Sequence, residues 1–233
     1  MLLSDYKWFQ AKPEGSDSQM LPELVVRRLG LQDYEPIFQS MRYLAENGKP
    51  GRADEIWLLS HKPVYTQGQA GKPEHILNPR DIPVVQVDRG GQVTYHGPGQ
   101  LVAYLLINVR RRRLGVRHLV DLIEASVIAT LDSFGIAAEA RAGAPGVYVN
   151  DAKIAALGLR IKNGWSYHGL SLNVNMDLAP FGNINPCGFE QLPVTQISEF
   201  VDADEQLLQH TSRVLTDNLL VNLGYGKHYE HEA

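Results

Sequence analysis

Hydrophobic side chains recur at helical spacing in three segments of the chain, residues 33–47, 118–134 and 204–223. In each segment, apolar residues return at intervals of three and four, which places them on one side of a helix. Asp33 opens the first segment as a candidate N-cap, and Gly135 follows the second as a candidate C-cap. We therefore predict three amphipathic helices.

Short apolar runs at residues 24–29, 56–60, 84–87 and 101–109 predict strands. The runs at 56–60 and 84–87 are expected to be buried, and the run at 101–109 is too apolar to face water. Because strands and helices do not alternate regularly, the pattern favours a single α+β domain. We expect a mixed or antiparallel sheet with helices packed against it.

A turn at residues 163–164 predicts which residues face each other in a β-hairpin. Asn-Gly is a strong signal for a two-residue turn. Equal distances from this turn place Gly158 opposite Gly169 and Ala156 opposite Ser171. Side chains alternate along a strand, so these residues share one face, which is nearly bare of side chains. Either a helix packs closely on this face, or a ligand approaches the backbone there.

The composition narrows the class of protein. The chain of 233 residues is 44% hydrophobic and 21% charged, and its formal charge of −4 gives no reason to expect nucleic acid as a partner. A single cysteine excludes an intrachain disulfide and a multi-cysteine metal centre. The longest apolar run, 101–107, is too short for a membrane helix, and no secretory signal opens the chain. We expect a cytoplasmic protein with one domain at 23–233 behind a flexible leader at 1–22.

The densest glycine cluster runs from Arg89 to Gln100 and reads RGGQVTYHGPGQ. It has neither the Walker ending nor the dinucleotide fingerprint, so a structural loop and a ligand-binding loop are both open. His96 and His168 have polar and glycine neighbours, although a structural role is the simpler explanation of each. The chain lacks the His-Glu-x-x-His and Gly-x-Ser-x-Gly motifs, which disfavours a zinc hydrolase and an α/β-hydrolase.

Cys187 is a candidate nucleophile because proline and glycine flank it and place it on a turn. The alternative is a buried, inert thiol. A thiol with its ordinary pKa is mostly protonated at neutral pH, so a nucleophilic cysteine needs a nearby cation or base. Lys153 is a candidate for that partner. A second predicted turn, at 150–151, places it opposite Tyr148, at the start of a strand whose neighbour leads toward Cys187.

A run of arginines from Arg110 to Arg113, with Arg117 close by, forms a basic patch on an otherwise acidic chain. Such a run is commonly a solvated face. It could also dock an acidic protein partner, since complementary charge speeds encounter. The sequence leaves both interpretations open.

Four motifs, in order along the chain, resemble those of the lipoyl(octanoyl) transferase family. They are the glycine-rich segment, KIAALGLRI from Lys153, HGLSLNVN from His168 and NPCG around Cys187. The resemblance extends over roughly residues 24–225. It implies the α+β fold shared by the catalytic domains of lipoate- and biotin-protein ligases.

The resemblance also implies an activity, in which an octanoyl or lipoyl group moves from acyl carrier protein to a lysine of a lipoyl domain. Cys187 would carry the acyl group as a thioester, and Lys153 would activate it. The acceptors would be the lipoyl domains of 2-oxoacid dehydrogenase complexes and the glycine cleavage H protein, and no cofactor or metal would be needed. The implied substrate-binding residues are Arg89, Gly90, Gly91, Gln92, Val93, Thr94, Tyr95, His96, Ala156, Leu157, Gly158, Gly169, Leu170 and Ser171.

Three other activities remain open from the sequence. The first is an ATP-dependent lipoate- or biotin-protein ligase of the same fold, which would need a catalytic lysine but not Cys187. The second is a module that binds the acylated carrier without forming a covalent bond. The third is a cysteine hydrolase that releases free octanoate. Fold alone does not decide between them.

Overall fold

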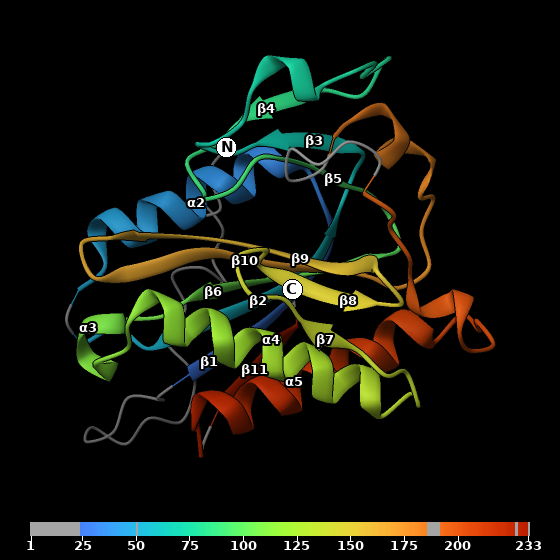
Figure 1. Ribbon diagram of the computed structural model, residues 1–233. Coiled ribbons are helices and arrows are strands. Elements are labelled where there is room, and N and C mark those ends of the chain that lie inside the picture. Colours follow the sequence, from blue (N-terminus) through green and yellow to red (C-terminus); the bar gives the residue numbers. More distant parts are fainter. Residues whose placement is uncertain (1–23, 50, 186–191, 227, 233) are drawn as a thin grey trace.

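The computed structural model describes residues 24–49, 51–185, 192–226 and 228–232, which form two β-sheets with helices packed around them (Figure 1). The larger sheet has eight strands, in the order β11 (His228–Glu232), β1 (Leu24–Gln32), β2 (Asp54–His61), β6 (Gln100–Leu106), β10 (Trp165–Asn173), β9 (Ala152–Lys162), β8 (Gly146–Val149) and β7 (Glu139–Ala140). The smaller has three, in the order β4 (Val84–Gln86), β3 (Val64–Gln67) and β5 (Val93–His96).

The larger sheet is mixed, as the sequence predicted. β1 runs parallel to β11 and β2, and the remaining pairs of this sheet are antiparallel. Helices α4 (Val116–Asp132) and α5 (Leu207–Leu223) cover one face, whereas α2 (Tyr34–Asn47) and the smaller sheet lie over the other (Figure 1). The prediction of one α+β domain with packed helices is thereby confirmed. The predicted leader at 1–22 lies outside the described residues, so its boundary stays a prediction.

β6 shows why one of the predicted strands is so apolar. Its residues Leu101, Ala103 and Leu105 pack into the core beneath α4 and α5, while Tyr104 and Leu106 pack into a second core beneath α2. A strand that is covered on both faces has no side chain left for water, so its sequence reads as a continuous hydrophobic run.

The three predicted helices are present, with small differences at their ends. α2 begins directly after Asp33, but the Asp33 side chain forms an ion pair with Lys62 instead of a capping hydrogen bond. After α4, Gly135 takes a φ of +72°, and the Ile136 N–H donates to the carbonyl of Leu131 at 3.0 Å, which closes the helix as predicted. The third helix, expected at 204–223, begins three residues later, at Leu207.

Two predicted strands need correction. The strand expected at 101–109 ends at Leu106, because the chain turns into α3 (Val109–Arg112) shortly afterwards. The Asn108 side chain accepts a hydrogen bond from the Arg111 N–H at the start of this helix. The run at 84–87 was expected to be buried, yet β4 is an edge strand of the smaller sheet with Val84 40% exposed. None of the helices in the described part of the chain is long and apolar enough to cross a membrane.

The β9–β10 hairpin forms in the predicted register. Gly158 lies opposite Gly169, and Ala156 lies opposite Ser171. The preceding hairpin also places Lys153 opposite Tyr148, after which a bulge shifts the pairing by one residue. Both registers follow from local turn chemistry, which is why the sequence alone was sufficient.

The bare face of this hairpin is covered by the glycine-rich segment and not by a helix. A Cβ on Gly158 would lie 3.1 Å from the Arg89 side chain and from the carbonyl of Gly90. Gly169 has a different reason to lack a side chain, because a Cβ there would lie 2.1 Å from the carbonyl oxygen of Ala103 on the neighbouring strand. His168, just before it, has a φ of +59°, so the strand is locally irregular.

Replacing Gly169 by alanine should therefore destabilise the protein. The added methyl group must displace a backbone carbonyl, and we expect a loss of about 1–3 kcal/mol in the free energy of unfolding. The measurement is urea denaturation followed by circular dichroism. The matched control is Gly182→Ala, where the added Cβ meets nothing within 4 Å. Equal midpoints for Gly169→Ala and wild type would contradict this assignment.

Candidate active site

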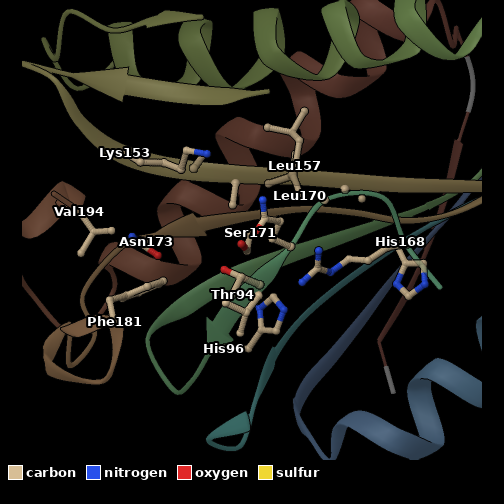
Figure 2. A pocket seen from close by; sticks show the side chains of 18 of the residues that line it. Thr94, His96, Lys153, Leu157, His168, Leu170, Ser171, Asn173, Phe181 and Val194 are labelled. Carbon is tan, nitrogen blue, oxygen red and sulfur yellow. The ribbon is translucent and has the colours of Figure 1, made fainter. Parts of the chain in front are cut away.

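A pocket lies between the β9–β10 hairpin and the glycine-rich segment (Figure 2). The space between its walls amounts to about 750 Å³, part of which is open solvent. The predicted site residues that line it are Arg89, Gly91, Gln92, Val93, Thr94, His96, Lys153, Ala156, Leu157, Gly158, Gly169, Leu170 and Ser171. The predicted groove over the glycine face is therefore present, with the loop at 89–91 as its opposite wall.

Two predicted substrate-binding residues do not line this pocket. The Gly90 N–H donates to the carbonyl of Leu159 at 3.1 Å, which fastens the glycine-rich segment to β9. The Tyr95 ring packs between Tyr65 and Phe181, with its centroid 5.5 Å from each of theirs. Both residues support the wall of the pocket from behind.

Arg89 contributes a buried positive charge to the pocket wall. Its guanidinium donates to the carbonyl of Thr66 at 2.8 Å, to the Thr66 hydroxyl at 2.9 Å and to the carbonyl of Gly90 at 2.9 Å. These neutral oxygen acceptors hold the side chain in place. The guanidinium charge is not cancelled by them, and it lowers the pKa of the buried histidines nearby as one of several causes.

Lys153 is buried at one end of the pocket, on the strand that the sequence predicted. Its backbone N–H donates to the carbonyl of Pro193 at 2.8 Å, and the Thr195 N–H donates to the carbonyl of Lys153 at 3.1 Å. Its Nζ donates to the carbonyl of Pro145 at 3.3 Å and lies 5.1 Å from the centroid of the Tyr148 ring. The lysine is thus fixed by its backbone as well as by its side chain.

A carboxyl group from α4 supports the wall beside Lys153. Glu124 accepts a hydrogen bond from the Gly146 N–H at 2.8 Å. Burial raises the pKa of Glu124, while that hydrogen bond and the charge of Lys153 oppose the rise. A Cβ on Gly146 would lie 3.3 Å from the Lys153 Nζ, so a larger residue would crowd the ammonium group.

Cys187 lies outside the described residues, so its geometry relative to Lys153 stays a prediction. The described residues nearest to it in sequence have defined partners. The Asn185 N–H donates to the carbonyl of His75 at 2.8 Å, and Pro193 accepts from the backbone of Lys153. The part of the chain that follows Cys187 by six positions is therefore in direct contact with the lysine.

Buried aromatic and imidazole rings form the other end of the pocket. The His96 ring stacks on Tyr34, with centroids 5.9 Å apart and an angle of 12° between the planes. His61 Nε2 lies 2.7 Å from the hydroxyl of Tyr104. Burial lowers the pKa of His61 to about 4. Burial, followed by electrostatic repulsion from His61, lowers that of His96 to about 3.

His168 is buried beside this ring cluster and is paired with Asp88. Its Nε2 lies 3.1 Å from Asp88, and the Tyr167 hydroxyl also donates to that carboxylate. Burial would raise the pKa of Asp88, but the two hydrogen bonds lower it to about 2. Burial lowers the pKa of His168, although Asp88 opposes the shift. The histidines of the pocket are therefore neutral at physiological pH.

A chain of buried hydrogen bonds connects the glycine-rich segment with Lys153. His96 Nδ1 donates to Gln100 Oε1 at 2.8 Å, because the Gln100 amide nitrogen donates in turn to Asn173 Oδ1 at 2.9 Å. The Asn173 amide then donates to the carbonyl of Thr195 at 3.0 Å, and Thr195 pairs with Lys153. A displacement at any member of this chain leaves a buried polar group without its partner.

Several pocket residues were not identified from the sequence. They are Tyr34, Tyr104, Ala155, Asn173, Phe181 and Val194. Tyr34 and Tyr104 stand at apolar positions of a helix and a strand, where a core role is the ordinary interpretation. Asn173 offered a signal, since it is a polar residue at the end of a buried strand, but its partner Gln100 is 73 positions away.

The arginine run is partly built into the fold. Arg111 pairs with Asp54 at 2.5 Å, and Arg112 lies over the Tyr225 ring at 4.0 Å. Arg110, Arg113 and Arg117 are exposed. Two of the arginines thus have structural partners, and docking of an acidic protein by the exposed ones stays a prediction.

The chain matches the family model of the lipoyl protein ligase A/B catalytic domain over residues 33–217. The octanoyltransferase of Aromatoleum aromaticum is 58% identical over 193 residues, which cover 83% of this chain and 84% of the relative. That of Pseudomonas putida is 57% identical over 201 residues, covering 86% and 93%. The chain therefore belongs to the octanoyltransferase family.

Solved structures of ligases share the fold at low sequence identity. A lipoate-protein ligase A bound with ATP superposes with a TM-score of 0.68 at 14% identity, covering 92% of this chain and 89% of the other. A putative lipoate protein ligase from T. acidophilum with bound lipoic acid gives 0.69 at 14% identity, covering 92% and 90%. At this identity, the similarity establishes the architecture alone.

The buried histidines predict that acid weakens the fold before the carboxylates titrate. Below their ordinary pKa of 6.5, His61 and His96 bind protons in the unfolded chain but not in the folded one. The contribution of the neutral histidines to the free energy of unfolding should be fully present above pH 6.5 and should decrease as the pH falls toward 4. Each histidine contributes a slope of about 1.4 kcal/mol per pH unit.

Urea denaturation at several pH values between 7 and 5 measures this slope. In His61→Gln the slope should be smaller by about one histidine's share, because glutamine does not titrate. The matched control is His210→Gln, on the outer part of α5. A slope that is identical in His61→Gln and wild type would show that His61 is not a neutral buried group.

Proposed function

We propose that this octanoyltransferase moves an octanoyl or lipoyl group from acyl carrier protein to the lysine of a lipoyl domain, through a thioester on Cys187. The observation that supports this most strongly is the place of Lys153. It is buried at the end of the pocket, and its backbone pairs with Pro193, six positions after Cys187. A cation beside a cysteine favours the thiolate, which is the reactive form.

In the first half of the reaction, the Cys187 thiolate attacks the carbonyl carbon of the octanoyl thioester. The bond between that carbon and the sulfur of the carrier's phosphopantetheine breaks as the new carbon–sulfur bond forms. Lys153 acts as the general acid and gives a proton to the departing thiolate. One thioester replaces another, so this step is nearly balanced in free energy.

In the second half, the acceptor lysine attacks the acyl-enzyme as a free amine. Lys153, now a neutral base, takes the proton that the amine loses, and the Cys187 thiolate departs. The product is an amide, which is more stable than a thioester, so neither ATP nor a metal ion is required. The two substrates use the same site in turn, which is ping-pong catalysis.

The pocket would hold the acyl chain along the glycine face of the β9–β10 hairpin. Phe181 and Val194 are apolar residues of the pocket lining. At about 0.8 kcal/mol per buried CH₂, an octanoyl tail contributes on the order of 5 kcal/mol of binding. The acceptors in this proposal are the lipoyl domains of 2-oxoacid dehydrogenase complexes and the glycine cleavage H protein. The reaction takes place in the cytoplasm, where a lone thiol stays reduced.

A ligase that activates lipoate with ATP is the second candidate, because the fold is shared with a lipoate-protein ligase solved with ATP. The two activities differ in the residues and co-substrate that they need. A ligase would require ATP and would tolerate the loss of Cys187. The transferase requires Cys187 and a thioester donor.

The first test is intact mass spectrometry of the enzyme after mixing with octanoyl-carrier protein in the absence of ATP. We expect the wild-type protein to gain one octanoyl group and Cys187→Ser to gain none. Lys153→Met should acylate at least a hundredfold more slowly, since general acid–base groups contribute about 10²–10⁴ in rate.

Two controls complete the experiment. Lys62→Met removes an exposed lysine in an ion pair with Asp33 and should acylate like wild type. Adding ATP, Mg²⁺ and free octanoate instead of the carrier tests the ligase. Octanoylation of a lipoyl domain by Cys187→Ser under those conditions would refute the thioester mechanism.

A further inference from the structure

A second groove adjoins the pocket on the side of β9 that faces α4. It is lined by Ala70, Gly90, Gly91, Gln92, Val116, Val120, Gly143, Ala144, Pro145, Leu157, Gly158 and Leu159. Gly91, Gln92, Leu157 and Gly158 line the pocket as well, so the groove and the pocket have part of their walls in common. Figure 2 shows the Leu157 side chain pointing toward α4, away from Thr94 and His96.

The groove follows a short stretch of β9 on whose outer edge the described part of the chain places no neighbouring strand. β8 pairs with β9 only as far as Ala156, and the next bond on that edge is the one from the Gly90 N–H to the carbonyl of Leu159. Because N–H and C=O groups point to the same edge at every second residue, Leu157 directs its own backbone groups into the gap between these contacts. An open strand edge of this kind binds extended amide chains.

We propose that this groove binds the phosphopantetheine arm of the acyl donor, with an amide of the arm paired to the backbone of Leu157. The proposal rests on the proposed function. The arm is an extended chain with amide groups, and its sulfur must reach the carbonyl near Lys153. The groove reaches the surroundings of Lys153, because Pro145, one of its lining residues, accepts a hydrogen bond from the Lys153 Nζ.

The outer end of the groove suits the charge of the arm. Val116 begins α4 and is 52% exposed, and Arg117, the next residue, is exposed as well. A cation at this point complements the phosphodiester at the head of the arm. Apart from Gln92, Leu157 and Leu159, the lining consists of glycine, alanine, proline and valine, so most of the side chains along the groove are small.

The test compares two donors in the first half of the reaction, measured as acylation of the enzyme. One is octanoyl-pantetheine, and the other is the octanoyl thioester of 2-mercaptoethanol, which has no amide. In Val116→Trp the indole should obstruct the groove. We expect the ratio of kcat/KM for the first donor to that for the second to fall by about tenfold, which is the effect of losing one or two hydrogen bonds.

The matched control is Val221→Trp, on α5, where the replaced valine is 76% exposed; it should keep the wild-type ratio. If Val116→Trp slows both donors equally, the groove does not recognise the arm and the proposal is wrong. It is also wrong if the ratio is unchanged and only transfer from the isolated acyl-enzyme to a lipoyl domain slows, since the groove would then serve the acceptor. Failure of the wild-type enzyme to acylate with octanoyl-carrier protein would instead overturn the proposed function.

Discussion

The contact between residues 89–91 and the glycine face of the β9–β10 hairpin is the constraint on which the site depends. Gly158 allows this close approach because it has no side chain, and the hydrogen bond from the Gly90 N–H to the carbonyl of Leu159 fastens the contact. The contact joins the smaller sheet to the larger one and sets the width of the pocket. A methyl group at position 158 would press on Arg89 and on the backbone of the loop, and so would move the wall that carries Thr94 and His96.

Local chemistry in the sequence was enough to predict part of this arrangement. The turn at 163–164 determines the register of the hairpin, and the position of Lys153 follows from the turn at 150–151. The error in β4 has an equally physical origin. A hydrophobic run is buried only when another part of the chain covers it. β4 is an edge strand, so it has a neighbouring strand along one of its edges and none along the other within its sheet.

The hydrogen-bond chain from His96 to Lys153 could not have been predicted in this way. Its members come from β5, β6, β10 and the segment after Cys187, and only the tertiary fold brings them together. Tyr34 and Tyr104 could not have been predicted either. Each belongs to the hydrophobic core and also lines the pocket, so its place in the sequence indicates only the core role. The family resemblance supplied motifs but no role for Asn173.

Likewise, the ligases that share this fold show that the architecture serves more than one acyl chemistry, so the reaction must be decided by individual side chains.

The two walls of the pocket belong to parts of the molecule with different local stability. β10 pairs with β6 and β9, and β6 is buried along its whole length, so we expect the amides of this wall to exchange slowly with solvent. The opposite wall is connected to the sheet of three strands, and the edge strand of that sheet, β4, is half-exposed. It therefore has the lower free energy of opening. In the proposed reaction, opening of this wall alone would admit a long acyl chain from the side, without threading it through the mouth of the pocket.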